Sequence, residues 1–337
     1  MPKEVWIALI TAATSLLVSI LSARAAWSTQ KKLAQLNDQG AERNARRDYE
    51  YEAKKRLYVE CEPVLFEAME FAENFRRRVV SLARSAKRGD LSPNGTGWLA
   101  TPGYYFRSTA YYYLAPATSF KILQRRLTAI DLALAPRIKF QYDLLKLTFN
   151  SYTWDHDLSM INPAVSYFPD GARPIDSEHQ LSEEPDIYRR QGLYLGIVDQ
   201  IADAMLEESE PLPRCKSLGK FWAEFDDTEV TFGHLSGEIV ELFTGFHPVS
   251  QPVLWRLLLT QYQLMGALLQ TQHAPADEYY DLAQILPSPS GKEAEDLDWR
   301  RGADGSDANE IHEVLEAGRV QVLSELRKIA RASRSDR

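Results

Sequence analysis

The feature that most constrains this chain is a stretch of nineteen uncharged residues near its N-terminus. Residues 5–23 read VWIALITAATSLLVSILSA. At 1.5 Å per residue, a helix of this length measures roughly 28 Å, which is close to the hydrocarbon thickness of a bilayer. Because one helix satisfies its own backbone polar groups, the segment can cross a membrane alone. The sequence therefore predicts a transmembrane segment over 1–24, with the lipid bilayer as a partner.

A cleavable signal peptide is the alternative interpretation, since Ala23-Arg24-Ala25 resembles a small-residue cleavage site. Three features count against it: the apolar stretch is long, the segment before it has one lysine, Lys3, beside Glu4, and basic residues follow it. Arg24, Lys31 and Lys32 lie on its C-terminal side. By the positive-inside rule, they place the rest of the chain in the cytoplasm. We expect a single-pass protein of the cell membrane, the inner membrane in a bacterium.

The predicted span carries hydroxyl groups on one face. Thr11, Ser15, Ser19 and Ser22 are spaced by four, four and three residues, so they share a side of the helix. Such a face can pack against a copy of itself in a homo-oligomer, or line a narrow water-filled pore. Alternatively, each hydroxyl bonds back to its own helix and is tolerated in lipid.

Residues 25–88 are predicted to form a juxtamembrane stalk followed by the first helix of a bundle. The stalk is highly charged, and Gly40 is expected to interrupt it. From Leu57 onward, apolar residues follow the four-three alternation of a coiled coil. This stripe predicts either a bundle core or a seam between subunits. Its members are Leu57, Cys61, Val64, Ala68, Phe71, Phe75, Val79 and Leu82.

The remainder, 89–337, is predicted to be a cytoplasmic α-helical domain, which makes the fold class all-α. It opens with a turn-rich stretch over 89–103. One short strand is expected at 229–232, and surface loops at 157–187 and 286–307. The 3.6-residue periodicity predicts helices over 104–114, 118–134, 137–156, 188–208, 216–226, 234–246, 251–272, 276–285 and 308–333.

The formal net charge of -8 hides an asymmetry along the chain. Residues 1–150 hold 23 basic and 14 acidic side chains, whereas the remainder holds 16 basic and 33 acidic ones. Such polarity favours head-to-tail packing of subunits, or a basic surface close to an anionic membrane. Solvated helix faces are the plain alternative.

No motif of a known catalytic or cofactor site occurs in the sequence. It contains no nucleotide-binding glycine loop, no nucleophile elbow and no HExxH zinc motif. Asp155, His156 and Asp157 form the densest acid–histidine cluster, and His234 and His247 bracket a predicted helix. A local cluster that ends a helix is more typical of a cap. We expect a protein that is not an enzyme, with no catalytic residue, metal ligand or cofactor.

A ligand-binding surface is better supported by the sequence. Residues 104–113 read YYFRSTAYYY, and aromatic rings beside guanidinium groups stack on bases and hold phosphates. A tyrosine-rich core helix flanked by solvated arginines is the alternative. The candidate ligand-binding residues are Arg76, Arg77, Arg78, Tyr111, Tyr112, Lys121, Arg125 and Arg126.

Three stretches, residues 111–144, 191–201 and 243–259, resemble segments of uncharacterised bacterial membrane-anchored proteins. They read YYYLAPATSFKILQRRLTAIDLALAPRIKFQYDL, QGLYLGIVDQI and FTGFHPVSQPVLWRLLL. The overall plan resembles effectors of bacterial antiphage systems, in particular the channel effector of the Hailong system. That resemblance implies an oligonucleotide ligand and a partner nucleotidyltransferase. It is architectural and transfers no functional residue.

The leading hypothesis is a membrane-anchored homo-oligomeric effector of bacterial defence. It would form a pore or ion channel gated by a nucleotide or oligonucleotide that binds its open and closed states differently. The alternative is a non-enzymatic membrane-tethered scaffold for a protein partner. A third hypothesis is a hydrolase that uses Asp155, His156 and Asp157.

Overall fold

The computed structural model describes residues 2–92, 96–127, 131–160, 191–208, 213–227, 231–248, 250–272, 286, 288–299 and 307–335. Among these residues helices dominate, and strands form a single two-stranded sheet. The prediction of an all-α fold is therefore confirmed. The chain divides into two compact units, Met1–Arg56 and Leu57–Arg337. The boundary falls inside the predicted segment 25–88.

The first unit belongs to a single helix, α1 (Lys3–Arg88), which also contributes residues to the second unit. Every residue from position 2 to 39 is exposed. The predicted interruption at Gly40 was wrong, because the helix continues through it. A glycine inside a helix costs about 1 kcal/mol but removes no backbone hydrogen bond, so the neighbouring residues can carry the helix past it.

The second unit, which we call the body, begins where α1 acquires its apolar stripe. All eight predicted stripe residues, from Leu57 to Leu82, are buried. They lie in the hydrophobic core of the body, so the bundle-core interpretation is confirmed. Pro63 lies inside α1 but on its exposed side. The proline removes one backbone hydrogen bond of the helix, and the buried stripe continues on both sides of it.

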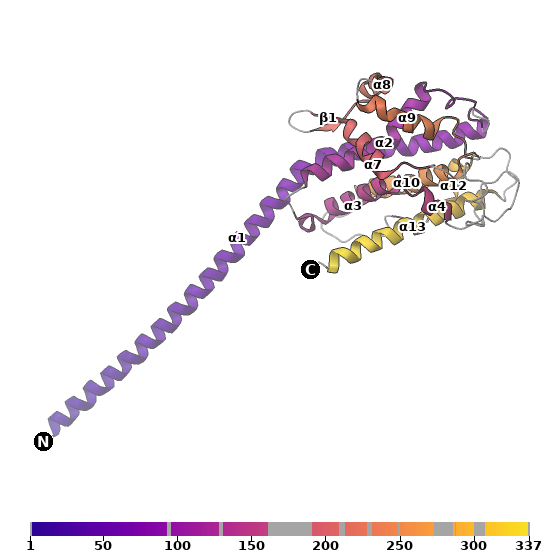
Figure 1. Cartoon of the computed structure of the whole chain (residues 1–337). Coiled ribbons are helices and arrows are strands. Elements are labelled where there is room, and N and C mark those ends of the chain that lie inside the picture. Colours follow the sequence, from indigo (N-terminus) through magenta and orange to yellow (C-terminus); the bar gives the residue numbers. More distant parts are fainter. Residues whose placement is uncertain are drawn as a thin grey trace. The chain divides into compact units, whose positions relative to one another are not determined.

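The other elements of the body are mostly short helices (Figure 1). α10 packs against α3 and α13, while α2 contacts α3, α7 and α9. The helices are α2 (Tyr104–Arg126), α3 (Pro136–Ser151), α4 (Asp155–Met160), α7 (Leu195–Ala204), α8 (Leu218–Phe225), α9 (Thr231–Phe243), α10 (Pro252–Gln270), α12 (Gly291–Leu297) and α13 (Asp307–Ser335), with a 3-10 turn η1 (Leu132–Leu134).

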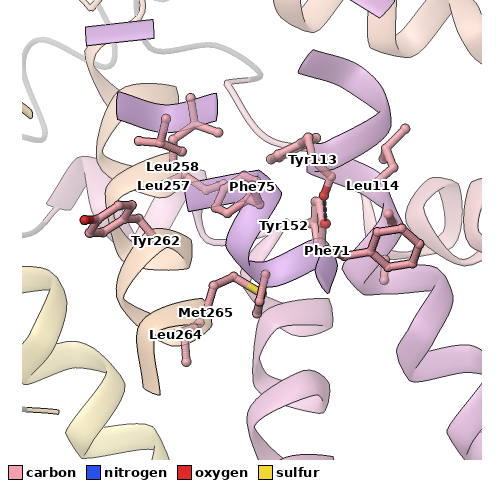
Figure 2. Packing of buried hydrophobic residues seen from close by; sticks show 14 of the residues in the cluster. Phe71, Phe75, Tyr113, Leu114, Tyr152, Leu257, Leu258, Tyr262, Leu264 and Met265 are labelled. Atoms are coloured by element: carbon pink, nitrogen blue, oxygen red, sulfur yellow. Dashed lines mark hydrogen bonds between the residues drawn. The ribbon is translucent and has the colours of Figure 1, made fainter. Parts of the chain in front are cut away.

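One core cluster joins α1, α2 and α10. Figure 2 shows Phe75 of α1, Tyr113 of α2 and Leu257 of α10 in this cluster. The hydroxyl of Tyr152, just after α3, donates a hydrogen bond to the carbonyl of Tyr113. Trp255 of α10 is fully buried. α10 is buried over most of its length, and its polar residues Arg256, Thr260, Gln261 and Gln263 are buried with the apolar ones.

The start of α10 is capped by a residue distant in sequence. The side-chain oxygen of Gln191 accepts hydrogen bonds from the backbone N–H groups of Val253 and Leu254, at 2.8 and 3.0 Å. These are first-turn N–H groups, which have no partner within a helix. Both residues are fully buried, so an acceptor from the chain is needed in place of water.

Predicted boundaries within residues 104–156 require correction. The two helices predicted over 104–114 and 118–134 are one helix, α2, which contains Pro116 and ends at Arg126. Residues 110 and 111 and 113–120 are all buried, and this packing on both sides of the proline outweighs the lost backbone bond. The helix predicted over 137–156 ends at Ser151, and α4 then begins at Asp155.

Further predictions were wrong in the second half. The end of the predicted helix 188–208 is strand β1 (Leu206–Glu207), paired antiparallel with β2 (Arg214–Cys215). In the predicted strand 229–232, residues 231 and 232 begin α9, where Phe232 stacks 4.8 Å from Phe221. The predicted loop 286–307 contains α12, capped by the Ser290 hydroxyl. The predicted helix 276–285 and most of loop 157–187 lie outside the described residues.

Candidate functional site

The hydroxyl face of the apolar stretch divides into two kinds of group. Thr11 donates to the carbonyl of Ile7 at 2.8 Å, and Ser22 donates to that of Val18 at 2.6 Å. Both therefore bond back to their own helix. Within the described part of the chain, Ser15 and Ser19 make no hydrogen bond. These two central hydroxyls keep their full bonding capacity for a group outside the helix.

The three consecutive arginines of α1 have different surroundings. Arg76 pairs with Glu293 at 3.1 Å, and its guanidinium lies 4.1 Å from the ring centre of Tyr262. Arg77 is exposed and pairs with Glu73, one turn earlier on α1. Both charges are therefore matched by a carboxylate within the body.

Arg78 faces α2 and contacts aromatic rings. Its guanidinium lies 4.6 Å from the ring centre of Tyr105 and 6.0 Å from that of Tyr112. One terminal nitrogen donates to the hydroxyl of Ser108 at 2.8 Å. Among the described residues, no carboxylate pairs with Arg78. Arg78 and Tyr112 are thus two predicted site residues that the fold brings together, and no acid among the described residues neutralises the Arg78 cation.

Tyr111 points into the core, away from Arg78. It is buried, and its hydroxyl donates to the carbonyl of Lys216 at 2.9 Å. The edge of its ring meets Phe71 of α1, with the ring centres 5.9 Å apart. Burial raises the pKa of this hydroxyl well above its ordinary value. Tyr111 therefore follows the alternative stated from the sequence, that of a core tyrosine.

The cations near the end of α2 pair with acids that follow much later in the sequence. Lys121 lies 2.6 Å from Asp199 and 3.6 Å from Asp203, both on α7. Arg125 lies 3.2 Å from Asp203 and 3.5 Å from Glu208. These two cations meet three carboxylates, so an anionic ligand would find no excess of positive charge here.

Arg126 lies at the last position of α2. Its Nε is buried and has no hydrogen-bond acceptor among the described residues. The guanidinium is close enough to Cys61 of α1 to oppose the rise in the pKa of that thiol, which burial brings to about 11. Arg126 therefore faces the core helix α1, and the structure does not group it with Arg78.

Beyond Tyr105, which belongs to the aromatic run but was not a candidate residue, two residues not predicted from the sequence extend this group of rings and cations. Trp98 is 49% exposed, and its ring packs edge-on against Tyr105 with the centres 5.2 Å apart. The guanidinium of Arg88 lies 5.9 Å from the Trp98 ring centre. We call Arg78, Arg88, Trp98, Tyr105 and Tyr112 the Arg78 cluster. In the sequence, the indication for Trp98 was its place in the turn-rich stretch 89–103, a few residues before the aromatic run.

The backbone fixes Trp98 against the end of α1. Its N–H donates to the carbonyl of Asp90 at 3.0 Å, and Leu91 forms a bridge with Gly97. Gly97 has φ +108°, and a Cβ there would lie 2.3 Å from the Asp90 carbonyl oxygen. Only glycine fits this close turn. Arg88 also pairs with Asp90 at 3.0 Å. Within the described part of the chain, Arg78 is therefore the cation of the Arg78 cluster that has no carboxylate partner.

The acid–histidine candidates lie on different elements of the body. Asp155 and Asp157 lie in the first turn of α4, and the side chain of His156 lies outside the described residues. His247 is buried against Trp299, and burial lowers its pKa to about 4. His234 is exposed on α9. Over the residues that the structure describes, no group of three His, Cys, Asp or Glu side chains is placed to hold a metal ion.

By length and composition, the first part of α1 contains a stretch able to cross a membrane, and none of that apolar stretch is buried. Together with the helical body, it defines the class: an all-α protein with an exposed apolar N-terminal helix. No protein family, curated protein or solved structure matches this chain. Its function is therefore inferred from its own residues.

Proposed function

We propose that this chain is a membrane-anchored homo-oligomer that forms a pore, with a cytoplasmic body that binds a nucleotide or oligonucleotide signal. The single observation that carries the proposal is the complete exposure of the apolar stretch of α1. Exposed apolar area costs about 25 cal/mol per Å² in water, so large side chains such as Leu9, Leu16 and Leu17 need lipid or another copy around them.

Membrane insertion is tested with two matched leucines of α1. Leu16 lies inside the apolar stretch and Leu36 beyond it, and both are more than 60% exposed. An arginine near the centre of a span costs about 2.5–3.5 kcal/mol. Leu16→Arg should therefore shift the protein from the carbonate-washed membrane fraction to the supernatant, and Leu36→Arg should not. Recovery of the wild type itself in the carbonate supernatant would rule out the anchor.

Pore formation is assigned to Ser15 and Ser19 because their hydroxyls bond to nothing on their own helix. Replacing both with leucine removes these groups and adds apolar bulk, so membrane depolarisation on overexpression should be lost. The matched control replaces Thr11 with valine and Ser22 with alanine, whose hydroxyls are already bonded within the helix. The control should depolarise like the wild type.

Two results would contradict the pore. One is equal depolarisation, or none, from the wild type and both double variants. The other is a monomer on light scattering of detergent-solubilised wild-type protein, because one span cannot enclose a channel. A ring-sized particle that the Ser15 and Ser19 substitutions reduce to monomers would instead locate the subunit contact on this face.

Ligand recognition is assigned to the Arg78 cluster. The exposed Trp98 ring offers a face on which a base can stack, which contributes about 1–3 kcal/mol per base. Arg78 supplies a cation for phosphate that no described carboxylate already neutralises. A nucleotide-type ligand of this kind implies a partner nucleotidyltransferase that makes it, and membership of a bacterial defence system.

Calorimetric titration of the full-length protein with ATP, cyclic dinucleotides and short oligodeoxyadenylates tests this assignment. Arg78→Gln and Trp98→Ala should each weaken the Kd for the bound species at least tenfold. Arg125→Gln is the control, because Asp203 and Glu208 already neutralise that cation. Equal losses in all three variants, or no binding of any probe to wild type, would contradict a site at this cluster.

A non-conducting scaffold for a protein partner is the second candidate. The neighbouring Tyr194 and Leu195, at the start of α7, are 62% and 46% exposed and favour it. A scaffold predicts no depolarisation from the wild type, and loss of its partner in Leu195→Glu. The depolarisation assay therefore separates the two candidates.

A further inference from the structure

The body contains a pocket that neither the pore nor the Arg78 cluster uses. It measures about 280 Å³ and lies between α1 and α3, beside Gln272 at the end of α10. This volume is just below the range for small-molecule sites, which begins at roughly 300 Å³. All of its lining residues belong to the body.

The wall of the pocket is mainly apolar. Leu65 and Met69 of α1 and Ile138 of α3 are buried, so they form a floor already excluded from water. Phe66 also lines the pocket but is 65% exposed. An apolar occupant would cover this ring, and the burial of apolar area would drive its binding.

The polar end of the pocket is formed by the guanidinium of Arg137, which has hydrogen-bond donors to spare. Arg137, in the first turn of α3, lies 5.6 Å from the ring centre of Tyr58 and bonds Glu62 through Nη2 at 3.3 Å. A guanidinium has five N–H donors, and this is the one hydrogen bond of Arg137 among the described residues. The Glu62 side chain is 58% exposed, so it leaves the mouth of the pocket open to solvent.

Each of the two glutamines that line the pocket has one of its two amide N–H groups engaged. Gln141 donates to the hydroxyl of Thr271 at 2.8 Å, and Gln272 donates to the sulfur of Met69. Arg137 is therefore the lining residue best able to donate to an occupant. Arg137 and Glu62 together carry no net charge, so an occupant need not be ionised to be accepted.

We infer that this pocket binds a small molecule with an aliphatic or aromatic body and one hydrogen-bond-accepting oxygen. The body fills the apolar wall of Leu65, Phe66, Met69 and Ile138, and the oxygen accepts from Arg137. A carboxylate and a neutral alcohol or carbonyl share this chemistry. The inference stands apart from the proposed pore and its nucleotide site, since it uses none of their residues.

Photo-crosslinking of full-length protein in lipid nanodiscs tests the site. The probe is octanoate with a diazirine on its chain, and crosslinked peptides are mapped by mass spectrometry. We expect crosslinks on α1 at 65–69 and on α3 at 137–141. The apolar stretch 5–23 provides an internal reference for labelling by simple partition into apolar surroundings.

Two matched substitutions on α3 separate specific binding from general effects. Arg137→Met keeps a long unbranched stem but removes the guanidinium donors, so crosslinking in the body should fall at least tenfold relative to that at 5–23. Lys139→Met, two residues further on, also removes a cation but does not line the pocket. It should leave crosslinking unchanged, and unfolding in urea verifies that both variants are folded.

Competition identifies the head group. Unlabelled octanoate competing better than octanol indicates an anionic ligand, and the reverse indicates a neutral one. Three outcomes would overturn the inference: equal crosslinking in Arg137→Met and wild type, competition by octane as strong as by either oxygen-bearing compound, or a co-purified protein crosslinked at 65–69 that the probe cannot displace.

Discussion

The helix α1 has two parts with the same backbone conformation but different surroundings, and we call them its two lengths. In Lys3–Arg56 no residue is buried, whereas in Leu57–Arg88 fourteen are buried in the core. The first length has one continuous apolar stretch and then a charged one, without a core-facing period. The second alternates by four and three, so one side faces other helices of the same chain. Periodicity, more than helical propensity, therefore decides which part of α1 finds its partners inside the chain.

The largest expected difference comes from truncating a leucine in each length. Leu82 is fully buried and Leu17 is 59% exposed. Leu82→Ala should lower the free energy of unfolding of the body by about 2–5 kcal/mol, because it removes buried contacts and leaves a cavity. Leu17→Ala should leave it unchanged. Urea unfolding of full-length protein in mild detergent, followed by tryptophan fluorescence, measures both; similar effects would break the comparison.

The pH dependence of stability should also arise in the body. Burial lowers the pKa of His247 from 6.5 to about 4. Between these values the unfolded chain binds a proton that the folded chain does not, so stability is lost as the pH falls from 6.5 toward 4. The full loss is about 3 kcal/mol. Residues 1–56 contain no histidine, so their helix content should not follow this titration.

Unfolding curves at pH 7 and pH 4 measure the effect, with His247→Phe as the reference. This variant keeps an aromatic ring against Trp299 but cannot titrate. The wild type should lose more stability than the variant over this interval. A pH dependence identical in the two proteins would contradict the assignment to His247.

Alanine at two glycines should have opposite effects in the body and in the exposed length of α1. Gly97→Ala should destabilise the body by about 1–3 kcal/mol, because φ is +108° and the new Cβ would collide with the Asp90 carbonyl. Gly40→Ala meets nothing within 4 Å and should strengthen its helix by about 0.5–1 kcal/mol. Hydrogen exchange at residues 36–44 and urea unfolding of the body read the two effects separately.

The smallest difference concerns ion pairs. Arg76 and Glu293 are each 26% exposed, and Arg76 also stacks on Tyr262, so Glu293→Gln should cost the body about 1 kcal/mol. Glu50→Gln removes the partner of Arg46 in the exposed helix and should leave the stability of the body unchanged. Urea midpoints at low and high salt test this, and a larger effect from Glu50 would reverse the comparison.

Much of the fold could be predicted because the spacing of apolar residues within a single segment indicates a helix. The stripe from Leu57 to Leu82, the helix over 251–272 and the helix over 308–333 all correspond closely to observed helices. The errors lie where packing between distant segments decides. Pro116 stays inside α2 because buried neighbours hold it, and β1 forms because β2 pairs with it.

The candidate site was harder to predict, because periodicity does not show which distant residues meet. Lys121 and Asp199 are 78 positions apart, and their pairing at 2.6 Å removes a charge that had seemed available for a ligand. The turn at Gly97 brings Trp98 against Tyr105, the ring that Arg78 also contacts. Composition identified the aromatic and basic surface, but only the packing of α1 on α2 selects its members.

The capping of α10 by Gln191 has a practical consequence for dissecting this protein. Any fragment that starts at the apparent beginning of the helix, near Gln251, leaves the amide protons of Val253 and Leu254 without their acceptor. A fragment that contains a capped α10 must therefore begin about sixty positions before the first turn of that helix. A truncation series should keep Gln191 if the excised piece is to retain its native core.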